Sequence, residues 1–123
     1  MRPGLPFIAA IALLAAACEI GVPVTIEVQS SRRVLFTIPE EHARSFCLVS
    51  ATIYRLAEGR EDAVWRIGLR RNAAAGPCRL SFAYPQPPPG FIAEIGSDHL
   101  EPGSYRVRID GGLPQATGDF TMP

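Results

Sequence analysis

The sequence predicts an all-β fold, an antiparallel β-sandwich of about seven or eight short strands preceded by a signal peptide. Two observations predict the strands. Apolar and polar residues alternate with a period of two along much of the chain, and clusters of Gly, Pro, Asp and Ser separate the alternating segments. A third observation, an apolar run close to the first residue, predicts the signal peptide.

The chain begins with a short positive segment, which is followed by the unbroken apolar run FIAAIALLAAA at residues 7–17. About 20 apolar residues are needed to cross a bilayer, so this run is too short for a transmembrane helix. A basic start, a short apolar middle and a small-residue end are the parts of a secretory signal peptide. We therefore assign residues 1–17 to a signal peptide, 18–22 to a lipidated Cys with a short tether, and 23–123 to one β-sandwich domain.

The apolar run leads into Cys18 in the stretch LAAAC. This stretch resembles the lipobox of bacterial lipoproteins, in which small residues precede a Cys that receives a diacylglyceryl group and becomes the N-terminus. Ala15 stands where Leu is commonest, and Ala15 with Ala17 also fits ordinary signal peptidase, which would leave a soluble periplasmic protein. In lipoproteins of diderm bacteria, Asp after the Cys tends to retain the protein in the inner membrane. Glu19 therefore favours the outer membrane, facing the periplasm.

Three cysteines are one too many for pairing alone. If Cys18 carries the lipid, Cys47 and Cys78 remain, and export places them in an oxidising compartment. A disulfide between them would close a loop of about 30 residues and contribute roughly 3–4 kcal/mol. The alternative is a pair of free buried thiols. We expect both side chains to point inward, because each lies in phase with apolar residues of its own segment.

Most strand segments show clean alternation, with one apolar and one polar face, as half-buried antiparallel strands require. These segments are residues 22–28, 34–38, 78–84, 105–110 and 120–122. The stretch YPQPPPG at 84–90 cannot continue a central strand, because proline removes a ladder donor. We expect a stiff loop there, leading to an edge strand at 91–95.

The segment FCLVSATIYRL at residues 46–56 is apolar on both sides and is open to two interpretations. A helix within 39–58 is one of them, because apolar residues recur at helical spacing. The β-branched and aromatic residues favour a long hairpin with residues 63–70, and we prefer it. The inward face of that hairpin would then carry Cys47, Val49, Ala51 and Ile53.

The stretch LEPGSYRVRI at residues 100–109 resembles the turn into the penultimate strand of immunoglobulin-like and fibronectin-type domains. In those domains a buried Tyr closes a corner by bonding to upstream backbone. The resemblance implies that Tyr105 is the corner residue and that the fold is an immunoglobulin-like β-sandwich, with Trp65 as a core aromatic. The cysteine spacing does not follow the antibody pattern, so only a generic sandwich is implied.

All 12 basic residues are arginine, and they balance 12 acidic residues. A near-neutral chain argues against nucleic acid as a partner. Arg66 and Arg70 are expected to share one strand face, as are Arg106 and Arg108. Together they would form an anion-binding patch, because guanidinium groups grip carboxylates and phosphates in bidentate fashion. The alternative is an ordinary solvated face.

His42 and His99 are the two histidines, and neither lies in a pattern typical of a catalytic or metal site. We expect no catalytic residues, no metal and no cofactor. The sequence thus predicts a non-enzymatic lipoprotein of the bacterial cell envelope. It would have a structural or interaction role, a lipid anchor in the membrane, and a protein or anionic partner. The alternative is a soluble periplasmic module that binds an anionic ligand or glycan on the arginine face.

Overall fold

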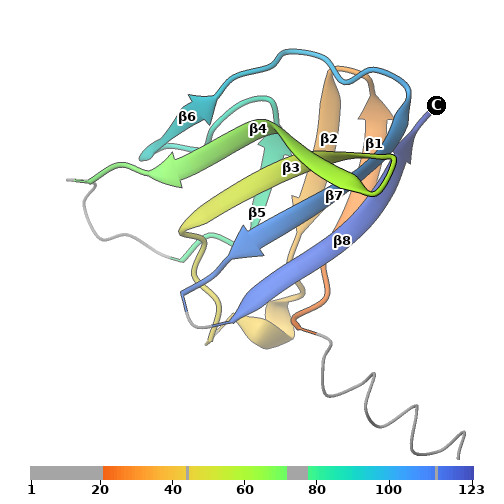
Figure 1. Cartoon of the computed structure of the whole chain (residues 1–123). Helices are drawn as coiled ribbons and strands as arrows, with labels where there is room; N and C mark the ends of the chain where they lie inside the picture. Colours follow the sequence, from red (N-terminus) through yellow and green to blue (C-terminus); the bar gives the residue numbers. More distant parts are fainter. Residues whose placement is uncertain (1–20, 44, 72–77, 113) are drawn as a thin grey trace, which may run out of the picture.

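The computed structural model describes residues 21–43, 45–71, 78–112 and 114–123, and in them it contains eight β-strands and one short 3-10 turn. The strands form two antiparallel sheets that lie face to face (Figure 1). The prediction of an all-β, sandwich-like chain is therefore confirmed. The predicted signal peptide and Cys18 lie outside the described residues.

The smaller sheet has three strands in the order β1-β2-β5, with bounds Thr25–Ser30, Arg33–Thr37 and Ser81–Tyr84. The larger sheet has the order β6-β4-β3-β7-β8. Its strands are β6 (Phe91–Ile95), β4 (Arg60–Leu69), β3 (Ser50–Ala57), β7 (Gly103–Asp110) and β8 (Gln115–Met122). The strand β6 lies at the edge, as the sequence predicts for residues 91–95.

The first described residues contact the start of β8 in the larger sheet. Val22 pairs in parallel with Ala116 of β8, and its N–H donates a 3.0 Å hydrogen bond to the carbonyl oxygen of Gln115. A Cβ atom on Gly21 would overlap that same carbonyl oxygen, so the close approach requires glycine here. Residues 21–22, which the sequence predicts to be part of the tether, therefore already contact the larger sheet.

The core between the sheets is built around aromatic rings. Trp65 is fully buried, and its ring centroid lies 5.2 Å from that of Tyr84 and 6.1 Å from that of Phe82. The ring of Phe120 stacks on Tyr105 with centroids 5.5 Å apart. Aromatic pairs at such separations add to the free energy gained from burial. Trp65 thus has the core position expected for it.

The hairpin interpretation of residues 46–56 is correct, and the helix interpretation is wrong. The only helical turn described between residues 39 and 58 is Glu40–His42, and β3 pairs with β4 from Ser50 onward. Trp65 lies opposite Ile53 while Ala63 lies opposite Tyr54, so β4 carries one extra residue at this point. This β-bulge bends β4.

Cys47 and Cys78 form a disulfide, with their Cα atoms 4.6 Å apart. The expectation that both side chains point inward is wrong, because both residues are exposed. Phe46 and Leu48 take the inward positions instead, and the ring of Phe46 lies so close to Gly111 that a Cβ atom there would overlap it. The alternation therefore changes phase before β3 begins, and Val49 is also exposed.

Candidate functional site

The outer face is our name for the solvent side of the five-stranded sheet. Strand register brings Arg66 of β4 and Arg108 of β7 to either side of Thr52 in the central strand β3. Neighbouring strands lie about 4.8 Å apart, so the two arginines flank Thr52 in one row. On the next row, Tyr54 lies opposite Arg106. Side chains from three strands thus meet above Thr52.

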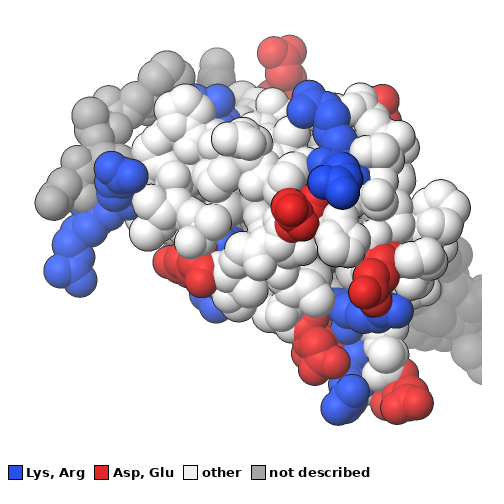
Figure 2. All heavy atoms as spheres, turned by 90° about the horizontal axis from the view of Figure 1, so that it is seen from above, with Lys and Arg blue, Asp and Glu red and all other residues white. Residues whose placement is uncertain are grey.

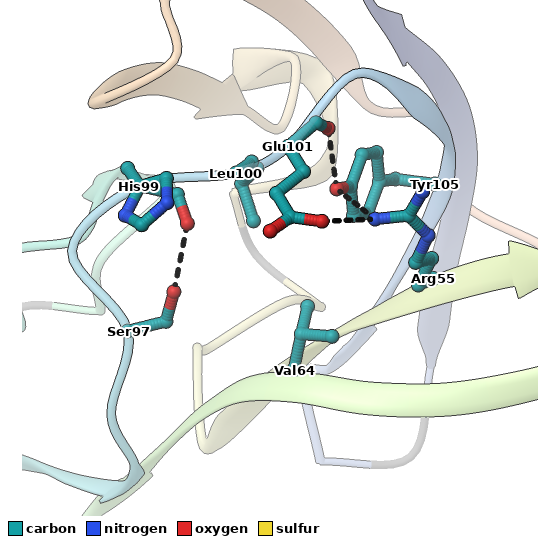
Figure 3. A pocket seen from close by; sticks show the side chains of 7 residues that line it. All are labelled: Arg55, Val64, Ser97, His99, Leu100, Glu101 and Tyr105. Atoms are coloured by element: carbon teal, nitrogen blue, oxygen red, sulfur yellow. Dashed lines mark hydrogen bonds and ion pairs between the residues drawn. The ribbon is translucent and has the colours of Figure 1, made fainter.

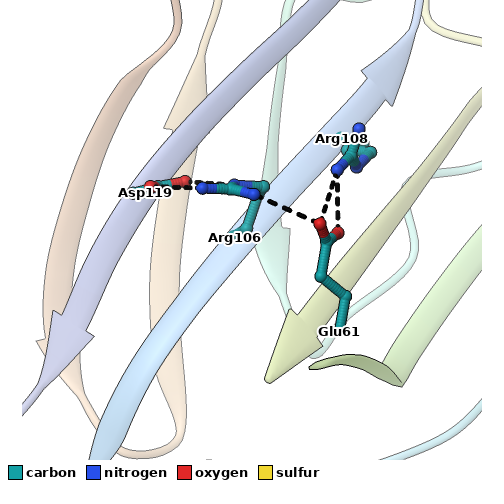
Figure 4. A network of polar contacts seen from close by, with 4 residues as sticks. All are labelled: Glu61, Arg106, Arg108 and Asp119. Carbon is teal, nitrogen blue, oxygen red and sulfur yellow. Dashed lines mark hydrogen bonds and ion pairs between the residues drawn. The ribbon is translucent and has the colours of Figure 1, made fainter. Parts of the chain in front are cut away.

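The arginines of the outer face are paired with carboxylates, and Figure 4 shows the contacts of two of them, Arg106 and Arg108. Arg106 donates to both carboxylate oxygens of Asp119, over 2.7 Å from Nε and 3.0 Å from Nη2. Glu61 lies between Arg106 and Arg108, accepting from Nη1 of the former at 3.2 Å and from Nη2 of the latter at 2.8 and 2.9 Å. Arg66 forms an ion pair of 3.2 Å with Glu94.

These contacts change the protonation behaviour of the network. The hydrogen bond from Arg108 is the main reason why the pKa of Glu61 lies below its ordinary value. The hydrogen bond from Arg106 likewise lowers the pKa of Asp119. The same contacts raise the pKa of Arg106. Glu61, Asp119 and Arg106 therefore remain charged at neutral pH, and the two carboxylates offset the charge of the arginines that they contact.

The structure brings together three of the four arginines named for an anion-binding patch. Arg66, Arg106 and Arg108 share the outer face, whereas Arg70 lies beyond the last residue of β4. Figure 2, which views the molecule from above, shows a mostly uncharged surface with separate basic and acidic groups and no large patch of one sign. Because carboxylates from other strands neutralise the three arginines, the outer face is less cationic than the strand pattern alone suggests.

A shallow depression of about 210 Å³ lies on the outer face above Thr52. Its polar lining comes from Ser50, Thr52, Arg66, Arg108, Asp110 and Gln115, and the ring of Tyr54 adds to its wall. The guanidinium of Arg108 lies over that ring, 5.6 Å from its centroid. Thr52 is only 6% exposed. No side-chain hydrogen bond in the described part of the chain involves Thr52.

A second hollow, of about 270 Å³, lies at the turn that precedes β7 (Figure 3). Tyr105 is buried, and its hydroxyl donates a 2.6 Å hydrogen bond to the carbonyl oxygen of Glu101. Arg55 donates to the carbonyl oxygen of Pro102 at 3.1 Å and pairs with the Glu101 carboxylate at 3.4 Å. Arg55 is half-buried in this turn, although its place in the alternation of the strand predicts a solvent-facing side chain. The groups here bond to one another, which is the pattern of a structural corner.

One of the two histidines lines the second hollow, and the other lines neither hollow. His99 lines the second hollow and contacts Asp98 at 3.2 Å, while His42 ends the 3-10 turn. Within the described ranges, no three His, Cys, Asp or Glu side chains are placed to hold a metal ion. The described residues also include no helix long and apolar enough to span a membrane.

Sequence reasoning missed Glu61 and Thr52. Glu61 follows Gly59 closely, so the sequence predicts a solvated turn residue. Its contacts with Arg106 and Arg108 depend on the pairing of β3 with both β4 and β7, which the sequence alone does not reveal. Thr52 reads as a polar strand residue with an exposed side chain. The arginines on either side of it, whose long stems cover neighbouring surface, explain its burial.

Comparison of the chain with protein-family models, with curated proteins and with solved structures finds no match. The fold and the disulfide thus define the class by themselves: an all-β protein of two antiparallel sheets, with one exposed disulfide.

Proposed function

We propose that the chain is a lipid-anchored protein of the bacterial cell envelope that acts by interaction and carries out no catalysis. The observation that carries the proposal is the LAAAC stretch ending at Cys18. The disulfide between Cys47 and Cys78 supports it, because this bond accounts for the other two cysteines and is typical of exported proteins. The anchor would lie in the outer membrane and face the periplasm.

The strand order supports an immunoglobulin-like sandwich. In such folds the strands A, B and E lie in one sheet, and C, F and G lie in the other, which in some members also includes C′ beside C. The order β1-β2-β5 corresponds to the first set and β4-β3-β7-β8 to the second, with β6 as an addition beside β4. Tyr105 lies at the start of the F-like strand, and its hydroxyl bonds to the upstream backbone as in a tyrosine corner. Domains of this architecture serve many functions, so the assignment concerns the scaffold alone.

The geometry also supports an anchored orientation. Val22 meets β8 at one end of the sandwich, and the turn between β1 and β2 lies at the other end (Figure 1). A lipid on Cys18 would therefore hold the domain by the end near Val22. Only residues 19–21 separate Cys18 from this contact, so the domain would lie within roughly 10 Å of the membrane surface.

Replacement of Cys18 by Ser tests the anchor. The wild-type protein should sediment with the membrane fraction, and the Cys18→Ser protein should appear in the soluble periplasm. Glu19→Gln is the matched control, because it changes the neighbouring residue and leaves both the lipid site and the disulfide in place. If the Cys18→Ser protein still sediments with membranes, the anchor proposal is wrong.

A second candidate function is a soluble periplasmic module that binds an anionic ligand or glycan on the outer face. The depression above Thr52 is the observation that favours it. The pairing of Arg66, Arg106 and Arg108 with carboxylates weighs against an anion as the ligand. Recovery of the wild-type protein from the soluble periplasm, with its chain starting after Ala17 and without a lipid on Cys18, would favour this candidate.

A further inference from the structure

The depression above Thr52 combines hydrogen-bond donors and acceptors. Arg66 uses Nε in its ion pair and Arg108 uses Nη2, so each guanidinium has further N–H groups beyond those the described carboxylates engage. Asp110 provides an acceptor, and the Gln115 amide provides both a donor and an acceptor. Such a mixture suits a ligand whose own groups both donate and accept.

Thr52 supplies an independent reason to expect a ligand here. Its side chain is more than nine-tenths buried, lines the depression, and takes part in none of the side-chain hydrogen bonds that the described residues form. Buried hydroxyl groups nearly always have a hydrogen-bond partner, because the loss of hydration is otherwise uncompensated. A ligand hydroxyl in the depression would provide that partner.

The electrostatics favour a neutral ligand over an anion. A carboxylate or phosphate placed between Arg66 and Arg108 would also meet the negative charges of Glu94 and Glu61, which pair with those arginines. Attraction and repulsion would then largely cancel. A ligand with several hydroxyl groups can accept from the guanidinium N–H groups and donate to Asp110, and it brings no charge into this balanced network.

We propose that the depression above Thr52 binds one neutral, polyhydroxylated residue, that is, a single sugar ring. The volume of about 210 Å³ is smaller than the roughly 300 Å³ at which pockets for drug-sized ligands begin, so the depression takes one residue of a glycan and leaves the rest in solvent. Sugar hydroxyls bond to Thr52, Arg108 and Asp110. This site does not depend on whether Cys18 carries a lipid.

The test is a titration of the isotope-labelled, purified protein with neutral and anionic probes. Binding is measured from the changes in the NMR chemical shifts of the backbone amides. The neutral probes are glucose, galactose, mannose and N-acetylglucosamine, and a trisaccharide of the best one distinguishes a free sugar from a glycan. Glucuronate and inorganic phosphate are the anionic probes. Thr52→Val removes the hydroxyl at constant shape. Thr117→Val is the matched control, because Thr117 lies opposite Arg108 in the same row but outside the depression.

We expect at least one neutral sugar to shift the amides of residues 50–54 and 106–110 saturably. Thr52→Val should weaken that binding about three- to tenfold, the worth of one hydrogen bond, while Thr117→Val leaves it unchanged. The proposal is overturned if no neutral probe shifts these amides at its solubility limit. It is equally overturned if an anionic probe binds about tenfold more tightly than every neutral one, or if the two Val variants bind alike.

Discussion

The hydroxyl of Tyr105 donates a 2.6 Å hydrogen bond to the carbonyl oxygen of Glu101, four residues earlier in the chain. This bond closes the turn that leads into β7. The guanidinium of Arg55 reaches the same turn from β3, and it lies 5.8 Å from the centroid of the Tyr105 ring. The corner therefore joins the turn to the central strand of the larger sheet as well as to β7.

The Tyr105 hydroxyl should contribute measurably to stability. Tyr105→Phe keeps the buried ring but leaves the Glu101 carbonyl oxygen without this donor, and we expect a loss of about 1–3 kcal/mol. Ser104→Ala is the control, because Ser104 is the exposed neighbour on the same strand and should change stability by no more than about 0.5 kcal/mol. Denaturant midpoints give both values. Equal losses would mean that the hydroxyl does not stabilise the turn.

Glu61 should make stability depend on acid pH. The pKa of Glu61 is lowered in the folded state, chiefly by the hydrogen bond from Arg108. Its contribution is therefore present above the unfolded pKa of about 4 and is lost as the pH falls through the lowered folded pKa. Glu61→Gln should destabilise the protein at neutral pH and flatten the decline in the free energy of unfolding below about pH 4.

Asp62→Asn is the matched control for Glu61→Gln. Asp62 is adjacent in the chain, but its ion pair with Arg60 spans 3.6 Å between two largely exposed side chains. Such pairs contribute little, so this variant should keep the acid decline of the unmodified protein. If the two variants give the same pH profile, Glu61 does not link the arginines of the outer face energetically.

Much of the fold follows from local patterns in the sequence, and the candidate site does not. Alternation and turn residues suffice to predict two antiparallel sheets and the edge position of β6, because each depends on a few neighbouring residues. The depression depends on the register between β3, β4 and β7, which are far apart in the sequence. Cys47 shows a subtler limit. The cysteine count predicts the correct disulfide, but the burial of Phe46 and Leu48 rules out the inward orientation expected for Cys47.

The disulfide should respond to reductant without prior unfolding, because Cys47 and Cys78 are both exposed. Alkylation before reduction should label neither residue, and alkylation after mild reduction in native buffer should label both. Replacing both cysteines by Ala should lower the free energy of unfolding by about 3–4 kcal/mol in the chain-entropy account of a 31-residue separation. Labelling that also requires denaturant would contradict the exposed position.

The Thr52 hydroxyl should not contribute to the stability of the unliganded protein. Thr52→Val replaces a buried group without a described partner by a methyl group and a good strand former, so the free energy of unfolding should stay within about 0.5 kcal/mol or rise. Thr117→Val, at an exposed position of β8, is the control that measures the effect of a Thr-to-Val change outside the depression on the free energy of unfolding. A loss of about 1 kcal/mol or more at Thr52 alone would show that its hydroxyl already has a partner within the fold.

The intact mass of the protein isolated from the envelope tests the central claim, the lipid anchor on Cys18, most directly. We predict a chain that begins at Cys18 and carries the additional mass of a diacylglyceryl group, with or without a further acyl chain on the new N-terminus. More than one chain would be present in either case, as stable membrane attachment requires. A chain that begins at an unmodified Cys18, or one that retains residues 1–17, would contradict the account.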